Sequence, residues 1–268
     1  MPDAAASPPP GVDPAAAALT ARLRAAGSVF AEDEAALLAT EARDAAELES
    51  MALRRIAGDP LEQIVGWAEF GRLRIALEPG VFVPRRRTEL LAELAASYAR
   101  PGMEVVELCC GAAAIAAVVQ ATVPGAHIVA ADVEEPAVRA ARRNLRPPAR
   151  VVQGDLYEPL PPELRGRIGL LAANTPYVPS DEIRNMPPEA RDHEPLVTLD
   201  GGADGLEVQR RIVADAPEWL APDGVLLIET SLGQAPRTMA LLVRAGLNAT
   251  VRRDPERAAT VVVGTRPA

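Results

Sequence analysis

The sequence contains no lysine, so all 28 of its basic residues are arginine. With 37 acidic residues the formal net charge is −9. This balance counts against the broad basic surface that a phosphate backbone requires, so nucleic acid is not an expected partner. Aromatic residues make up only 3% of the chain, whereas hydrophobic residues make up 49%. We therefore expect a core built mainly from Ala, Val, Leu and Ile.

Cysteine and histidine are also scarce. The two cysteines, Cys109 and Cys110, are adjacent in the chain, and adjacent cysteines seldom pair. The histidines show no metal-ligand spacing, so we expect buried thiols in a reducing compartment and no metal. The N-terminus lacks a basic stretch followed by an apolar one, and no apolar run reaches the roughly 20 residues that span a membrane. These absences predict a soluble, cytoplasmic protein without a membrane partner.

Changes in residue pattern divide the chain into four predicted segments. The first is rich in Pro and Ala, which is typical of disorder. The second repeats apolar residues every three or four positions and predicts a small helical domain for substrate recognition. In the third, alternation over Trp67–Ile75 and a turn at Glu78–Gly80 predict a β-hairpin linker whose second strand is Val81–Pro84. The predicted boundaries are 1–14, 15–62, 63–84 and, for the main domain, 85–268.

Short apolar strands alternate with helices throughout the main domain. The expected strands lie near 104–109, 127–132, 150–153, 168–173 and 224–230, and the expected helices cover 87–99, 112–122, 135–145 and 205–220. This alternation predicts an α/β fold with a doubly wound parallel sheet. Near 247–253 and 260–265 two further strands follow without a long crossover, so we expect an antiparallel C-terminal hairpin.

Acidic residues lie at the ends of three consecutive predicted strands: Glu107, Asp132 and Asp155. Ligands of such sheets bind beyond the carboxyl ends of the strands, and an acid after the second strand can accept both hydrogen bonds of a ribose diol. The loop after the first strand contains a single glycine, Gly111, which gives little support to pyrophosphate binding. A nucleoside without phosphates is the better-fitting ligand.

The segment Val81–Leu91 resembles the entry to the catalytic domain of the HemK/PrmC family, and the similarity continues in the same order from about residue 60 to 230. It includes Gly154–Tyr157, Asn174–Tyr177, His193–Pro195, Leu199–Leu206 and Leu220–Glu229. Members of this family are S-adenosylmethionine-dependent methyltransferases that act on a glutamine side chain of peptide-chain release factors. The resemblance implies a class I methyltransferase (Rossmann-like) fold preceded by a helical domain.

The resemblance also implies roles for individual residues. Around the cofactor, Glu107, Cys109 and Gly111 would border the methionine part, Asp132 and Val133 the ribose, and Asp155 and Leu156 the adenine. The tetrad Asn174, Thr175, Pro176 and Tyr177 would hold the nitrogen to be methylated, with Asn174 also bordering the cofactor. The chain departs from the family pattern at three positions: Cys109 and Ala113 replace glycines of the first loop, and Thr175 replaces a proline.

The tetrad suits a planar nitrogen for a physical reason. An amide nitrogen is a poor nucleophile, so the site has to aim its lone pair at the methyl group. The Asn174 side-chain oxygen and the main-chain carbonyl of Thr175 can accept its two N–H groups, and Tyr177 can stack on the planar group. Glu194 is expected to help position the substrate, and Arg85 to bind a phosphate or carboxylate group.

Several acceptors remain open from the sequence. The simplest is the glutamine amide of a release factor, with the helical domain gripping the protein. A small amino-acid-like substrate carrying an amide or a guanidine, such as arginine, is the first alternative, and the departures at Cys109, Ala113 and Thr175 favour it. An adenine of nucleic acid is the second, although the acidic charge counts against it. An inactive paralogue that only binds the cofactor is the third.

Overall fold

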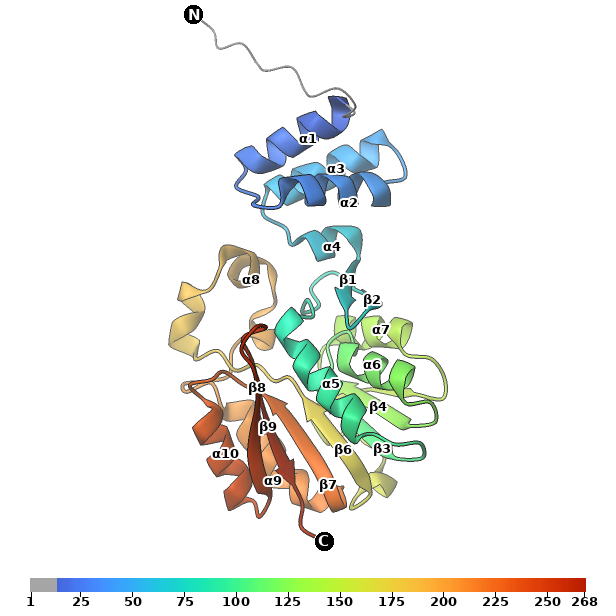
Figure 1. Cartoon of the computed structure of the whole chain (residues 1–268), viewed down its shortest axis with the longest axis vertical. Coiled ribbons are helices and arrows are strands. Elements are labelled where there is room, and N and C mark those ends of the chain that lie inside the picture. The colour runs from blue at the N-terminus through green and yellow to red at the C-terminus, as the bar shows by residue number, and fades with distance from the viewer. Residues whose placement is uncertain (1–13) are drawn as a thin grey trace, which may run out of the picture.

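A computed structural model describes residues 14–268 of the chain. Four helices come first: α1 (Pro14–Ala25), α2 (Ala31–Glu41), α3 (Ala45–Ile56) and the short α4 (Leu61–Val65). Of the segment 1–14 predicted to be disordered, residues 1–13 lie outside the described residues, and Pro14 already begins α1. The N-terminal helices bury their own small core, which includes Leu19, Leu23 and Leu38. They form a layer apart from the sheet, as Figure 1 shows.

The β-hairpin after these helices differs from the prediction. It consists of β1 (Trp67–Phe70) and β2 (Leu73–Ala76), and its turn is Gly71-Arg72 rather than Glu78–Gly80. Both turn residues have positive φ, 54° and 65°, as two-residue hairpin turns of this kind require. Residues 81–85 form no strand; instead, Val81 and Val83 are buried in the main core. The predicted second strand was therefore wrong because its apolar residues serve packing and not pairing.

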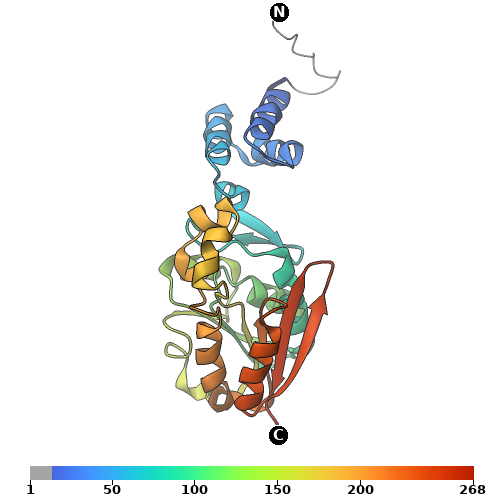
Figure 2. The ribbon, with the colours of Figure 1, turned by 90° about the vertical axis from the view of Figure 1, so that its left-hand side faces the viewer.

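The main domain contains a seven-stranded sheet in the order β5-β4-β3-β6-β7-β9-β8. The parallel strands are β3 (Glu104–Leu108), β4 (His127–Asp132), β5 (Arg150–Gln153), β6 (Ile168–Ala173) and β7 (Leu220–Glu229). The last two, β8 (Asn248–Asp254) and β9 (Ala259–Thr265), pair antiparallel with each other, and β9 is also antiparallel to β7. Figure 2 shows them at one edge of the sheet. This topology confirms the predicted doubly wound α/β fold with an antiparallel C-terminal hairpin.

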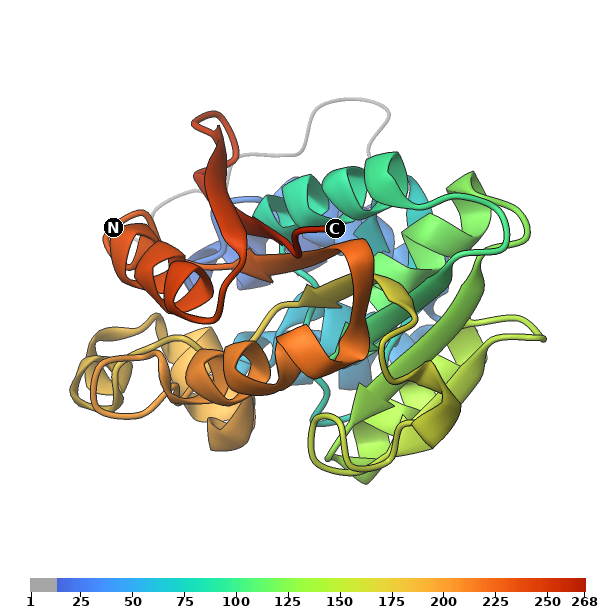
Figure 3. The same ribbon diagram turned by 90° about the horizontal axis from the view of Figure 1, so that it is seen from below.

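Helices cover both faces of the sheet because successive strand residues point to opposite sides. Val105, Leu170 and Leu227 face a core with α5 (Glu89–Tyr98), α6 (Ala114–Thr122) and α7 (Glu135–Asn144). Their chain neighbours Val106, Leu171 and Leu226 face the other core with α9 (Glu207–Trp219) and α10 (Ala235–Arg244). Figure 3 shows α5 and α9 on opposite sides of the sheet.

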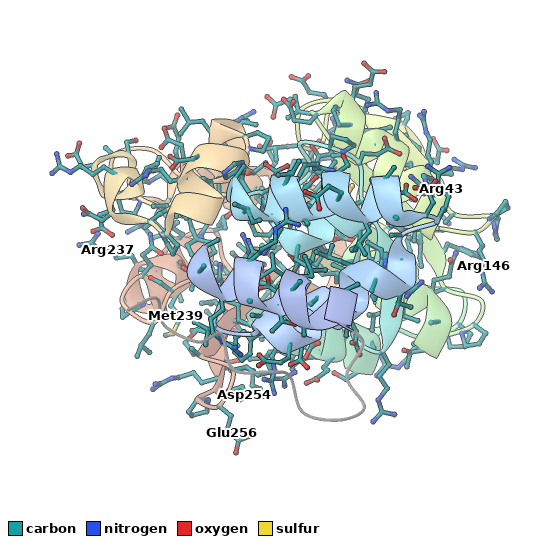
Figure 4. All side chains as sticks on the ribbon, turned by 90° about the horizontal axis from the view of Figure 1, so that it is seen from above. Arg43, Arg146, Arg237, Met239, Asp254 and Glu256 are labelled. Atoms are coloured by element: carbon teal, nitrogen blue, oxygen red, sulfur yellow. The ribbon has the colours of Figure 1, made fainter. Side chains whose placement is uncertain are left out.

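Two details of these elements were not expected. Helix α10 falls in 231–246, where the sequence analysis assigns no element. Strand β7 begins at Leu220, four residues before the expected start, because Ala221–Gly224 bulge out of its pairing with β6. The exposed side chains of Arg43, Arg146, Arg237 and Glu256 point outward from the rim of the molecule in Figure 4.

Short helices complete the connections around the carboxyl ends of the strands. The 3-10 helix Arg86–Thr88 precedes α5, and Pro162–Leu164 precedes β6. The long connection from β6 to α9 contains Ser180–Asn185, α8 (Pro188–His193) and Leu196–Thr198. Figure 1 shows α8 at the same end of the sheet as the N-terminal helices. This connection therefore lies between the helical layer and the ends of the strands.

Candidate functional site

A cavity of about 520 Å³ lies at the carboxyl ends of the parallel strands. The structure brings every predicted site residue to its lining: Arg85, Glu107, Cys109, Gly111, Asp132, Val133, Asp155, Leu156, Asn174, Thr175, Pro176, Tyr177 and Glu194. Topology explains this convergence, since β3, β4, β5 and β6 are neighbouring parallel strands whose carboxyl ends meet at one edge. The lining also includes Thr88, Arg87 and Arg211, which the sequence analysis did not assign to the site.

The loop after β3 has the backbone of a glycine-rich loop but contains only one glycine, Gly111. Cys109, Gly111 and Ala113 have φ values of 52°, 52° and 57°. This left-handed region costs a non-glycine residue about 1–2 kcal/mol. The side chains of Cys109 and Ala113 therefore do not prevent the loop from adopting its turn, but they add strain to it. Burial and the nearby carboxylates raise the pKa of the Cys109 thiol, which disfavours its reactive thiolate form.

Asp132 ends β4 and ties two loops together. One carboxylate oxygen accepts the Gly111 N–H at 2.8 Å, and the other accepts the Glu134 N–H at 3.0 Å. Burial raises the pKa of Asp132, against the opposing effect of these two hydrogen bonds. Each oxygen still has a second lone pair, so the carboxylate can accept further hydrogen bonds from a diol.

Glu107 is the most buried of the three strand-end acids, with 3% of its surface exposed. Its Oε2 accepts the Ala116 N–H at 2.7 Å, at the N-terminus of α6. Burial nevertheless raises the pKa of Glu107 to about 8, and the negative charge of Asp132 adds to the effect. A positively charged ligand at this wall would lower the pKa of Glu107 again and so favour its carboxylate form.

Asp155 lies two residues beyond β5 and forms an ion pair with Arg211 of α9 at 2.6 Å. The pair lies where the resemblance expects an adenine, and it fixes α9 against this loop. Leu156 follows with φ of 50°, again in the left-handed region, and its side chain lines the cavity. Arg211 could not be found from the sequence because only the fold brings α9 beside the loop after β5.

Asn174 follows directly after β6, and its amide is oriented by a neighbour that the sequence did not reveal. Its Nδ2 donates to the hydroxyl of Thr88 at 3.2 Å. Thr88 is buried at the end of the 3-10 helix that precedes α5. No described residue donates a hydrogen bond to the Asn174 Oδ1. The side chain is thus held by its nitrogen and retains a free acceptor oxygen on the cavity wall.

The side chain of Tyr177 contacts two charged residues, Glu229 and Arg87. Its hydroxyl donates to Glu229 Oε1 at 3.4 Å, and Arg87 Nε lies 3.3 Å from the same oxygen. The Arg87 guanidinium lies 5.8 Å from the centre of the Tyr177 ring. Burial raises the pKa of Tyr177 to about 12, so the phenol stays neutral and cannot serve as a base near pH 7. Glu229, which ends β7, is itself almost fully buried.

The glycines of the block Leu199–Leu206 allow this segment to lie against the tetrad. Gly201 N–H donates to the Val178 carbonyl at 2.9 Å, and a Cβ at Gly201 would come within 2.8 Å of the Pro176 oxygen. A Cβ at Gly205 would come within 2.3 Å of the Tyr177 oxygen. Any larger residue at these positions would displace the tetrad, which explains the glycines in physical terms.

Glu194 and Arg85 form an ion pair at the substrate side of the cavity. Burial raises the pKa of Glu194, although Arg85 opposes the shift. The second oxygen of this carboxylate, Oε2, is buried without a hydrogen-bond partner among the described residues. The Thr175 hydroxyl is in the same condition. Arg85 is thus paired within the protein. The groups of this wall that lack a partner among the described residues are a carboxylate oxygen of Glu194 and the hydroxyl of Thr175.

Within residues 14–268, no cluster of three or more His, Cys, Asp or Glu side chains is arranged to hold a metal ion. None of the helices in this range combines the length and the apolar character needed to cross a membrane.

Comparisons with known proteins show that this chain is similar to methyltransferases. The family model described as "Methyltransferase small domain" matches residues 72–182. A release factor glutamine methyltransferase from Geobacter sulfurreducens is 36% identical over 215 residues, which cover 79% of this chain and 75% of that protein. A 4-amino-L-phenylalanine/4-methylamino-L-phenylalanine methyltransferase from Streptomyces pristinaespiralis is 39% identical over 201 residues, covering 72% and 68%. Curated relatives such as these are matched over 66% to 75% of their length.

A solved structure of a methyltransferase from Pyrococcus furiosus aligns with 82% of this chain and 100% of that chain. Its TM-score is 0.55 at 16% identity, so it supports the fold alone. The sheet order and the flanking helices are those of a class I methyltransferase, as the sequence analysis expected.

Proposed function

Because the chain belongs to the HemK/PrmC family of S-adenosylmethionine-dependent methyltransferases, we propose that it methylates the side-chain amide nitrogen of a glutamine in a peptide-chain release factor. The observation that carries this proposal is the orientation of Asn174. Thr88 holds the amide nitrogen of Asn174, and the free oxygen borders the cavity that also contains the strand-end acids. An N–H acceptor and the proposed cofactor site would thus share one cavity.

The cavity suits S-adenosylmethionine by the charged and polar groups that line it. Asp132 offers lone pairs on both oxygens to a ribose diol, and Glu107 offers a carboxylate to the ammonium group of the methionine part. The ion pair of Asp155 and Arg211 flanks the proposed adenine position together with Leu156. When bound, the cofactor would supply a methyl group on a positively charged sulfur, which is already activated for transfer.

The residues of the tetrad would aim the acceptor. The Asn174 oxygen and the main-chain carbonyl of Thr175 would each accept one N–H of the amide, which directs the lone pair of the nitrogen towards the methyl group. The amide nitrogen would exchange one of its two N–H protons, released to solvent, for the methyl group that the cofactor would supply. Tyr177 would form a neutral wall against the planar amide.

The N-terminal helices are proposed to grip the protein substrate. They expose several apolar side chains, with Phe30 68% and Leu53 55% exposed. Figure 1 places them at the end of the sheet where α8 lies. A contact of 3.3 Å between an Asp59 carboxylate oxygen and His193 Nδ1 links the helical layer to the segment that carries Glu194. A protein acceptor bound there would reach the cavity. We propose that the enzyme acts on this acceptor in the cytoplasm.

A labelled-methyl assay tests this function. We expect transfer to a purified release factor and not to free arginine or to DNA, with labelled S-adenosylmethionine as donor. The release factor with its target glutamine replaced by alanine is the matched control and should remain unlabelled. Transfer to the alanine variant at the rate of the unmodified factor would refute glutamine methylation.

A second candidate function is methylation of a small aromatic amine on an amino acid. The relative from Streptomyces pristinaespiralis is named for such a substrate and is 39% identical. The Asn174 oxygen can accept an N–H from an aryl amine as well as from an amide. Including 4-amino-L-phenylalanine in the same assay decides between the two: labelling of the amine without labelling of the release factor would support the second function.

A further inference from the structure

Asn144, the last residue of α7, connects three separate parts of the fold through its side chain. The residue is half-buried, and its Oδ1 accepts the Ala76 N–H at 2.8 Å. Its Nδ2 donates to the Ala76 carbonyl at 2.9 Å and to the Ala112 carbonyl at 2.8 Å. A carboxamide has two N–H donors and one acceptor oxygen. Both donors and the oxygen of Asn144 are therefore engaged at short distances.

The first two of these hydrogen bonds attach α7 to the β-hairpin. Ala76 is the last residue of β2, and Asn144 pairs with both its N–H and its carbonyl, as a residue of an adjacent strand does. An ion pair of 2.8 Å between Arg143 and Glu78 attaches the same helix to the segment after β2. Of these two attachments, that of Asn144 alone continues to the cavity.

The third hydrogen bond reaches the loop after β3. Ala112 belongs to this loop and lines the cavity, and three residues of the loop have positive φ. Backbone of this kind persists where its surroundings hold it in place. The Ala113 N–H donates to the Cys110 carbonyl at 2.7 Å, and the Ala112 carbonyl is the other side of the same peptide group. Asn144 thus completes the contacts that fix this peptide group on both sides.

We infer that Asn144 is a positioning residue for the cofactor site, which it serves by tying the loop Cys109–Ala113 to the hairpin. The inference rests on the proposed cofactor and adds a residue that neither lines the cavity nor ends a strand. The peptide group between Ala112 and Ala113 sets the position of the loop backbone at the cavity wall. Loss of the Asn144 amide therefore weakens cofactor binding without removing a contact to the cofactor itself.

Two substitutions separate the loop contact from the hairpin contact. Asn144→Leu removes all three hydrogen bonds at similar size, whereas Asn144→Asp keeps the acceptor for the Ala76 N–H and loses both donors. In calorimetric titrations with S-adenosylmethionine, both variants should raise Kd about three- to tenfold, as the loss of one hydrogen bond to the loop implies. At saturating cofactor, kcat for the release factor should change little. Full cofactor affinity in Asn144→Asp would overturn the inference.

Two matched controls exclude a general loosening around α7. The amide of Gln120 makes a similar pair of hydrogen bonds to the main chain of Arg146, at 2.7 and 2.9 Å, without contacting the loop. Arg143→Met removes the ion pair with Glu78 and leaves the loop contact intact. Both Gln120→Met and Arg143→Met should keep the Kd of the unmodified protein. An equal loss of affinity in either control would contradict the role of the loop contact.

Amide hydrogen exchange without cofactor provides a measurement that is independent of binding and activity. In Asn144→Leu the Ala113 N–H should exchange faster, while Val106, buried inside β3, should change little. An equal acceleration at both residues would indicate global destabilisation, and the inference would fail. If the unmodified protein did not bind S-adenosylmethionine, the proposed function would fail instead, and the exchange rates would still decide whether Asn144 holds the loop.

Discussion

The loop after β3 can be tested by comparing two alanine-to-glycine substitutions in the same part of the core. Ala113 and Ala117 are both buried, with 0% and 6% of their surface exposed. Ala113 has φ of 57°, whereas Ala117 lies inside helix α6. Each substitution removes one buried methyl group, so the difference between the two variants isolates the effect of the backbone conformation.

The magnitudes follow from the two environments. Ala117→Gly loses about 0.8 kcal/mol of methyl burial and about 1 kcal/mol of helix propensity, close to 2 kcal/mol in total. Ala113→Gly loses the same methyl burial and about 0.4–1 kcal/mol through the freer unfolded chain, but it relieves about 1–2 kcal/mol of left-handed strain. The Ala113 variant should thus be nearly as stable as the unmodified protein.

Thermal unfolding measures this difference. At about 2–4 °C per kcal/mol for a protein near this size, the two midpoints should differ by roughly 4–8 °C. Cofactor affinity, measured by titration calorimetry on the same variants, should not fall in Ala113→Gly, because the loop keeps its conformation. Equal losses of stability in the two variants would refute the assignment of a strained, glycine-like loop.

Four further outcomes are expected. Asn174→Ala should abolish turnover while the Kd of the cofactor, measured by calorimetry, stays nearly unchanged, since its oxygen serves the acceptor alone. Asp132→Ala should weaken cofactor binding by about 1–3 kcal/mol in the same titration, through the loss of hydrogen bonds to a charged group. Between pH 4.5 and about 8 the folded protein retains a proton on Glu107 that the unfolded chain has lost. The free energy of unfolding should therefore fall as pH rises through this range. Glu107→Gln should remove that part of the pH dependence. Glu229→Gln should lower kcat more than it changes the cofactor Kd. Arg87 and the Tyr177 hydroxyl both contact the Glu229 carboxylate, so the substitution weakens the contacts that position the tetrad.

Much of the fold could be predicted because its signals are local. The alternation of short apolar strands with helices indicated the parallel sheet, and the missing crossover before 260–265 indicated the antiparallel pair. The hairpin was misplaced because Gly71-Arg72 and Glu78–Gly80 are both plausible turns, and only the burial of Val81 and Val83 decides between them. Helix α10 was missed although Ser231 and Gln234, whose side chains hydrogen-bond to each other, precede it and Pro236 lies in its first turn.

The candidate site likewise has residues that the sequence predicts and partners that only the structure reveals. Residues at strand ends, such as Asp132 and Asn174, could be placed together because parallel topology brings these ends to one edge. The residues that orient the site are distant in sequence. Thr88 lies 86 positions from Asn174, Arg211 lies 56 from Asp155, and Glu229 lies 52 from Tyr177. No local pattern connects such pairs, so the contacts that orient the site could be found only in three dimensions.

Half of the non-glycine residues with positive φ and half of the unpaired buried side-chain atoms among the described residues lie in or beside the cavity. Three of its lining residues or loop positions, Cys109, Ala113 and Leu156, hold left-handed backbone without being glycine. Among the described residues, six buried side-chain atoms lack a hydrogen-bond partner, and three of these belong to Thr175, Glu194 and Glu229. Such costs persist in a native structure where the surrounding fold maintains them and a function uses them. Their presence at the ends of the strands supports a site shaped for polar ligands on both the cofactor side and the acceptor side.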